Sequence, residues 1–113
     1  MELTYTEAKE LIRAIGRFEA MDFEHYGLTT LQGTNGAEYA IGTDDEADNA
    51  WNESLNSYLD ECLYPEMPEF AQSYFNEEKW KSDAKHDGRG HSLSSYDGCE
   101  TELDCGLFVY RIN

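Results

Sequence analysis

The sequence predicts an α+β domain in which a small antiparallel sheet, built from two hairpins, packs against two to four helices. Three observations lead to this fold class. Several segments repeat apolar residues at helical spacing, two strand-like runs flank an Asn-Gly dipeptide, and the chain ends in a run of alternating side chains. A chain of 113 residues has the usual length of one domain, so we predict a single acidic domain over residues 1–113.

The first helix is predicted to begin after Thr4. Thr4 and Glu7 have the spacing of a capping box, in which each side chain accepts a hydrogen bond from the other residue's backbone N–H. The apolar residues that follow recur every three or four positions, which extends the predicted helix to Phe18: they are Ala8, Leu11, Ile12, Ile15 and Phe18.

A hairpin is predicted next. Two strand-like runs, Tyr26–Gln32 and Ala37–Gly42, flank the sequence GTNG. Asn35 and Gly36 both tolerate a positive φ, which tight hairpin turns require.

The longest helix is predicted from Asp44 to Glu61. Thr43 and Glu46 form a second capping box, and acidic residues fill the first turn, where the helix dipole favours negative charge. One stripe of the helix is apolar and is predicted to be buried: it consists of Ala47, Trp51, Leu55, Tyr58 and Cys62. Pro65 and Pro68 are predicted to break this helix.

The remaining elements are short. We predict a helix around Glu69–Phe75, a helix from Glu77 to His86 capped by Asn76, and a final hairpin with its turn at Asp104–Gly106. The last strand, Leu107–Ile112, is predicted to have one well-buried face.

The charge is unbalanced. The net charge is −16, and the segment from Phe18 to Glu78 contains fifteen Asp and Glu residues without a Lys or Arg. Such a surface repels nucleic acid and anionic membranes, which we exclude as direct partners, and it attracts basic surfaces that normally hold nucleic acid. A need for solubility also produces acidic surfaces, and so does adaptation to high salt, although high-salt adaptation normally spreads the acids evenly.

We predict that two acidic patches contact such a partner. The first lies on the long helix and consists of Asp44, Asp45, Asp48, Glu53, Asp60 and Glu61. The second precedes the last strand and consists of Asp97, Glu100 and Glu102. If the last hairpin packs beside the long helix, the two patches form one surface.

The segment Asp87–Gly98, DGRGHSLSSYDG, has the highest density of polar and ionisable side chains in the chain and is predicted to be a loop. An enzymatic alternative uses Asp87, His91 and Asp97 with a serine nucleophile, which requires all of these groups within mutual reach. Serine-rich loops more often use their hydroxyls in turns, so we predict no enzyme activity. Arg89 is predicted to anchor the loop to a nearby carboxylate.

No metal or other cofactor is predicted. A zinc site would have to gather His86, His91, Cys99 and Cys105, whose spacings do not match the paired ligands of zinc sites. The three cysteines lack a CxxC pair and are predicted to be reduced thiols of a cytosolic protein. The chain also has no apolar run long enough for a transmembrane helix and no secretory signal pattern.

The runs AEYAIGTDDEAD and DGRGHSLSSYDG and the terminal YRIN resemble a set of small acidic proteins of bacteriophages and mobile elements. The resemblance covers roughly residues 37–50 and 87–113. It implies an inhibitor of the anti-CRISPR or antirestriction kind, acting in the cytoplasm of a bacterial host on a nuclease complex. A phage accessory or assembly protein that uses Trp51, Tyr58 or Tyr74 in a hydrophobic interface is a further alternative.

Overall fold

The computed structural model describes residues 2–113 and has an α+β fold, as predicted. The strands are β1 (Phe18–His25), β2 (Leu28–Gly33), β3 (Glu38–Thr43), β4 (Thr101–Glu102) and β5 (Leu107–Arg111). The longer helices are α1 (Tyr5–Ile15), α2 (Asp44–Tyr58) and α5 (Glu77–Ala84). The shorter helical segments are the π-helix η1 (Leu59–Leu63), α3 (Tyr64–Glu66), α4 (Glu69–Gln72), the 3₁₀ turn η2 (Lys85–Asp87) and α6 (Arg89–Leu93).

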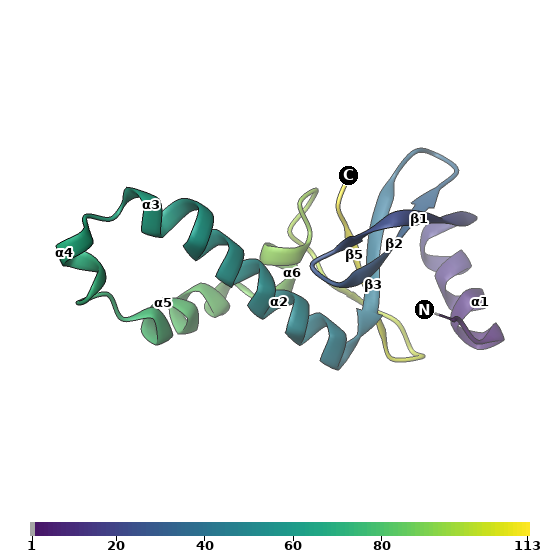
Figure 1. Cartoon of the computed structure of the whole chain (residues 1–113). Coiled ribbons are helices and arrows are strands. Elements are labelled where there is room, and N and C mark those ends of the chain that lie inside the picture. Colours follow the sequence, from purple (N-terminus) through teal and green to yellow (C-terminus); the bar gives the residue numbers. More distant parts are fainter. Residues whose placement is uncertain (1) are drawn as a thin grey trace.

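The molecule is elongated, with principal extents of 53 × 24 × 23 Å. The sheet and α1 occupy one end, while α2 runs away from the sheet and continues through η1 and α3 (Figure 1). The chain then turns through α4 and comes back along α5. We call residues 59–84, which project from the sheet, the arm.

The five strands form one antiparallel sheet in the order β1-β2-β3-β5-β4. Both predicted hairpins are present, as β2–β3 around Asn35-Gly36 and as β4–β5. Gly36 has a φ of 85°, a conformation that tight hairpin turns require and that glycine adopts without strain. The two hairpins join into one sheet because β3 pairs with β5, where Ile41 lies opposite Val109.

The first strand is not predicted by the sequence, and the expected extension of the first helix to Phe18 is wrong. The helix ends at Gly16, whose φ of 81° turns the chain, and Phe18 begins β1 opposite Gly33. The residues of β1 that are half-buried are Phe18, Met21 and His25, because the register shifts between Ala20 and Glu24. This bulge hides the period of two that would have indicated a strand.

The sheet is buried on both faces. Leu11 of α1 packs with Leu107 and Val109 on one face, while α2 and α6 pack with Phe108 and Tyr110 on the other. The expectation that Leu107–Ile112 has a single well-buried face is therefore wrong, because its two sets of alternating side chains enter two separate clusters.

Both predicted capping boxes are confirmed, at Thr4 with Glu7 and at Thr43 with Glu46. The predicted apolar stripe of the long helix is buried only near the sheet: Ala47 and Leu55 are buried, whereas Tyr58 and Cys62 are exposed. Tyr58 stacks on Trp80 of α5 instead of packing on the sheet, and the buried residue next to it is Leu59, which lies outside the predicted stripe.

The prediction that Pro65 breaks the long helix is wrong, since helical structure continues to Glu66 and ends before Pro68. Proline lacks an N–H, and its ring clashes with the carbonyl of the preceding turn in a regular α-helix. Here Pro65 lies two residues after the wider π turns of η1, where the N–H of Tyr64 bonds to the carbonyl of Leu59. This widening accommodates the proline within the helical run.

The segment Asp87–Gly98 is not a plain loop, because α6 lies inside it. Gly90 explains the close packing of this helix. A Cβ at Gly90 would lie 2.7 Å from backbone atoms of Cys99 and Glu100. The backbone of α6 is therefore in direct contact with the backbone of Cys99 and Glu100. That contact positions Arg89 beside Glu100.

Candidate functional site

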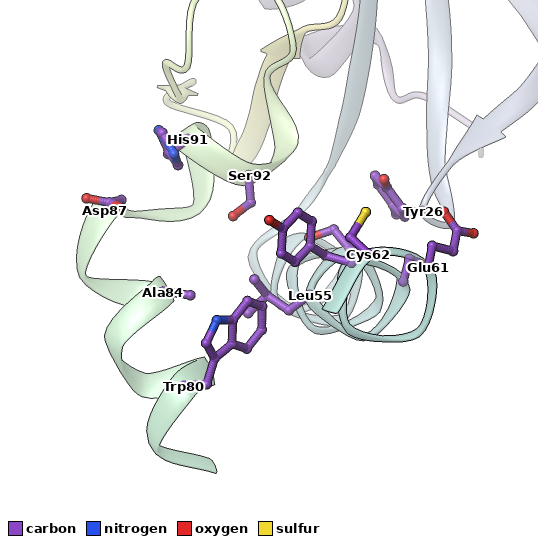
Figure 2. A pocket seen from close by; sticks show the side chains of 12 residues that line it. Tyr26, Leu55, Glu61, Cys62, Trp80, Ala84, Asp87, His91 and Ser92 are labelled. Atoms are coloured by element: carbon purple, nitrogen blue, oxygen red, sulfur yellow. The ribbon is translucent and has the colours of Figure 1, made fainter. Parts of the chain in front are cut away.

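A cavity of about 610 Å³ lies between α2 and the segment from α5 to α6. Asp87 and His91 line one side of it, and Glu61 lies on the other (Figure 2). Its floor and walls include Leu55, Tyr58 and Trp80, and the rings of the two aromatic residues stack with their centroids 5.8 Å apart.

The three residues of the enzymatic alternative are not assembled in this cavity. Asp97 lines a different cavity beside Arg111, and its carboxylate accepts hydrogen bonds from Ser94 and from the backbone N–H of Cys99. Two of the three serines are also engaged: Ser92 accepts a bond from the indole of Trp51, and the single hydroxyl proton of the buried Ser94 is shared between the Asp97 carboxylate and the Arg111 carbonyl, each 2.7 Å from the Ser94 oxygen. The hydroxyls of this segment thus hold α6 against its neighbours.

The hydrogen bonds from Ser94 and Cys99 lower the pKa of the Asp97 carboxyl below its ordinary value. A depressed folded-state pKa adds stability above the ordinary pKa near 4 and loses it as the pH falls through the folded value. We therefore expect Asp97→Asn to flatten the loss of stability on acidification below about pH 4. Urea denaturation between pH 2 and pH 6, compared with exposed Asp104→Asn as control, checks this, and equal slopes in the two variants would contradict it.

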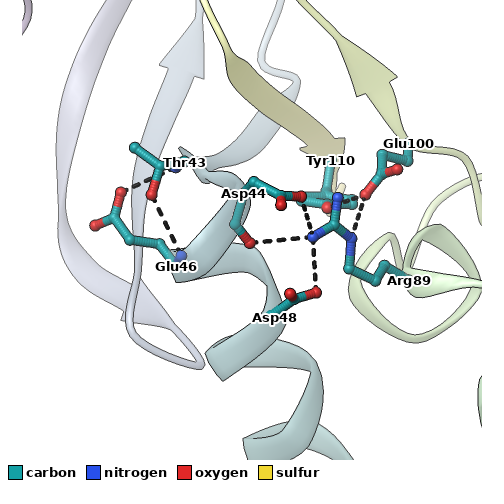
Figure 3. A network of polar contacts seen from close by, with 7 residues as sticks. All are labelled: Thr43, Asp44, Glu46, Asp48, Arg89, Glu100 and Tyr110. Atoms are coloured by element: carbon teal, nitrogen blue, oxygen red, sulfur yellow. Dashed lines mark hydrogen bonds and ion pairs between the residues drawn. The ribbon is translucent and has the colours of Figure 1, made fainter.

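Arg89 is the centre of the polar network on the other side of α6 (Figure 3). Its guanidinium lies 2.8 Å from Asp44, 2.9 Å from Asp48 and 2.8 Å from Glu100. It also donates to the backbone carbonyl of Asp44 and stands over the ring of Phe108, 4.6 Å from its centroid. The prediction that Arg89 anchors this segment to a carboxylate is confirmed, and the anchor joins three carboxylates rather than one.

The network reaches into the sheet through Tyr110, whose hydroxyl donates to Glu100. Burial and this acidic partner raise the pKa of the Tyr110 phenol far above its ordinary value, so the phenol stays protonated. Burial alone lowers the pKa of the Arg89 guanidinium, but its bonds to Glu100 and Asp44 outweigh that effect and raise it. The cation is therefore permanent, and it fixes the start of α2 to α6 and to the segment before β4.

The two predicted acidic patches meet at Arg89. Asp44 and Asp48 of the first patch and Glu100 of the second all bind it, so part of their charge is neutralised inside the protein. The remaining members of the patches have other environments. Asp45, Glu53, Asp60, Glu61 and Glu102 are exposed, and no ion pair within residues 2–113 engages them.

Two aromatic side chains at the end of the arm are strongly exposed. Phe70 and Tyr74 are 76% and 87% exposed. Sequence reasoning named Tyr74 only within the hydrophobic-interface alternative and missed Phe70. A signal was present in the sequence, because residues 64–80 contain five aromatic side chains without the long helical periodicity that would bury them.

Over residues 2–113, no three His, Cys, Asp or Glu side chains are placed to hold a metal ion, and Cys62, Cys99 and Cys105 are free thiols. None of the helices described in that range has the length and apolar character needed to cross a membrane. No protein-family model, curated protein or solved structure matches this chain.

Proposed function

We propose that the protein inhibits a nuclease complex of a host defence system by occupying a basic surface that normally binds nucleic acid. Its carboxylates stand in for phosphates, and it acts in the cytoplasm of the bacterial host. The phage setting rests on the resemblance of AEYAIGTDDEAD, DGRGHSLSSYDG and YRIN to small acidic phage proteins. The mode of action rests on the charge distribution.

The observation that carries the proposal is the acidic run from Phe18 to Glu78. It folds into consecutive elements from β1 across α2 to the arm. Among residues 2–113, the ion pairs that involve this run use only Asp44, Asp48 and Glu77, so twelve of its fifteen carboxylates make none. Self-repulsion of this kind destabilises a domain, and a basic partner would relieve it.

The helical run from Asp44 to Glu66 supplies a rod for these charges. Its 23 residues span about 35 Å at 1.5 Å per residue. Six of its carboxylates are outside the Arg89 network, which is one charge per roughly 6 Å, about half the charge density of a single nucleic-acid strand. These six residues are Asp45, Glu46, Glu53, Asp60, Glu61 and Glu66.

The turn between β1 and β2 brings further carboxylates to the middle of this rod. The carboxylate of Glu53 lies 3.7 Å from where a Cβ of Gly27 would stand, so this turn lies against α2. Glu24, at the end of β1, is exposed beside it. The acidic surface is therefore broader than one helix face.

A charge-removal experiment tests the proposal. The variant Glu53→Gln/Asp60→Asn/Glu61→Gln changes the net charge from −16 to −13, and so does the control Glu2→Gln/Asp83→Asn/Asp104→Asn, whose positions lie outside the predicted patches. In a pull-down from bacterial lysate, we expect the first variant to recover at least tenfold less of the nuclease complex than the wild-type protein, and the control variant to recover as much as the wild type. A tenfold loss of affinity corresponds to about 1.4 kcal/mol, which the loss of three close charge pairs across an interface exceeds.

The same pull-down is repeated at high salt and with excess DNA or RNA. Recovery of the complex by the wild-type protein should fall in both conditions, because screening weakens exposed charge contacts and nucleic acid competes for the surface. A complex retained at high salt and in the presence of competitor would contradict the proposal.

A further inference from the structure

The arm buries too little apolar surface to account for its own composition. Leu59, at the base of the arm, is its one buried residue; no side chain of residues 60–84 is buried, although this segment contains Leu63, Tyr64, Phe70, Phe75 and Trp80. The arm is held by the stacked pair Tyr58–Trp80 and the edge-to-face pair Tyr64–Phe75. Such pairs add little stability beyond the area that they bury.

Three hydrogen bonds close the turn of the arm without burying its outer aromatic residues. The Tyr64 hydroxyl donates to Glu77, and the Gln72 amide donates to the carbonyls of Tyr64 and Met67. These bonds fix the turn around α4, and they leave Phe70 and Tyr74 pointing outward at 76% and 87% exposure. A preformed turn that presents two exposed aromatic rings is typical of an interface anchor, since aromatic side chains dominate the energy of protein interfaces.

The charge around these rings selects the partner. The arm has seven carboxylates against two lysines, Lys79 and Lys81, and its segment 59–78, which contains the exposed rings, has six of these carboxylates and neither lysine: Asp60, Glu61, Glu66, Glu69, Glu77 and Glu78. A second copy of this arm would bring the same negative charge against the first, and an anionic membrane would repel it in the same way. A surface with Lys and Arg around an apolar pocket complements both features.

We propose that Phe70 and Tyr74 anchor the arm in an apolar pocket with a basic rim on the partner protein. This inference rests on the proposed function for the identity of that partner, the host nuclease complex. The rings supply contacts that salt does not screen, while the surrounding carboxylates align the arm with the rim. The tip of the arm lies far from the sheet (Figure 1). The tip can therefore enter the partner's apolar pocket while the acidic surface of α2 lies along the partner's basic nucleic-acid-binding surface.

Site-specific photo-crosslinking in bacterial lysate tests this inference. The photoreactive residue p-benzoylphenylalanine is placed at position 70 or 74, and at position 5 as control, because Tyr5 is a similarly exposed aromatic residue on α1 at the other end of the molecule. We expect positions 70 and 74 to crosslink to peptides of the nuclease complex that border Lys and Arg residues, with at least tenfold lower yield at position 5.

The outcomes separate the two proposals. Excess nucleic acid added to the lysate before irradiation should abolish the crosslinks. Crosslinks to a basic protein surface that persist with nucleic acid present would support the anchor and contradict the proposed function. Crosslinks only to another copy of this chain, equal yields at position 5, or no crosslink at positions 70 and 74 would overturn the anchor.

Discussion

Replacing Arg89 by alanine is expected to lower the free energy of unfolding by about 3 kcal/mol. The side chain of Arg89 is only 11% exposed, and its removal would leave Asp44, Asp48 and Glu100 facing one another without a cation. The contact with Phe108 would be lost as well, so both charge and packing contribute.

Urea denaturation of Arg89→Ala measures this loss, and Lys81→Ala is the matched control. Lys81 makes a single ion pair with Glu77 on the surface of α5, which contributes less than about 0.5 kcal/mol. If Arg89→Ala loses no more stability than the control, the network does not hold the start of α2 to α6. Arg89→Lys should keep the charge but lose the forked geometry that serves three carboxylates, and should fall between the two.

Replacing Gly90 by alanine is expected to destabilise the fold by about 2–3 kcal/mol. The added methyl group would lie 2.7 Å from the backbone of Cys99 and Glu100, and backbone atoms cannot move aside as a flexible side chain can. The separation of α6 from the segment before β4 would also draw Glu100 away from Arg89.

The control for this prediction is Gly106→Ala. Gly106 has a φ of 92°, and a methyl group added there would have no other atom within 4 Å, so the substitution strains the backbone but clashes with nothing. It should cost about 1 kcal/mol. Equal losses in the two variants, measured by urea denaturation, would show that steric contact at Gly90 is not limiting.

Local signals in the sequence predict much of the fold. The capping boxes at Thr4 and Thr43, the cap at Asn76 and the Asn35-Gly36 turn each depend on residues within three or four positions, and each is confirmed. The strand β1 was missed because its partner β2 and a bulge determine its pattern of burial. Its place in the sheet is a tertiary property that its own residues do not encode.

The candidate site divides in the same way. The acidic run is a matter of composition, so exposed residues such as Glu53 and Asp60 could be named from the sequence. The network of Arg89 joins carboxylates 45, 41 and 11 residues away. Helical spacing places Asp44 and Asp48 on one face and Asp45 on another, but the local sequence does not show which of these faces α6 covers. The tertiary packing of α6 against α2 decides this.

The π-helix η1 has a consequence for the direction in which the arm points. A π turn contains one more residue than the regular i→i+4 ladder, and one residue corresponds to about 100° of rotation around a helix axis. The helical turn that follows, Tyr64–Glu66, is therefore rotated by about that angle relative to where an uninterrupted α2 would place it. The chain then leaves the helix through the extended residues Met67 and Pro68, so the direction of the arm's tip depends on this rotation together with that turn. A one-residue deletion between Leu59 and Leu63 would therefore redirect the tip while leaving the sequence of residues 64–84 unchanged.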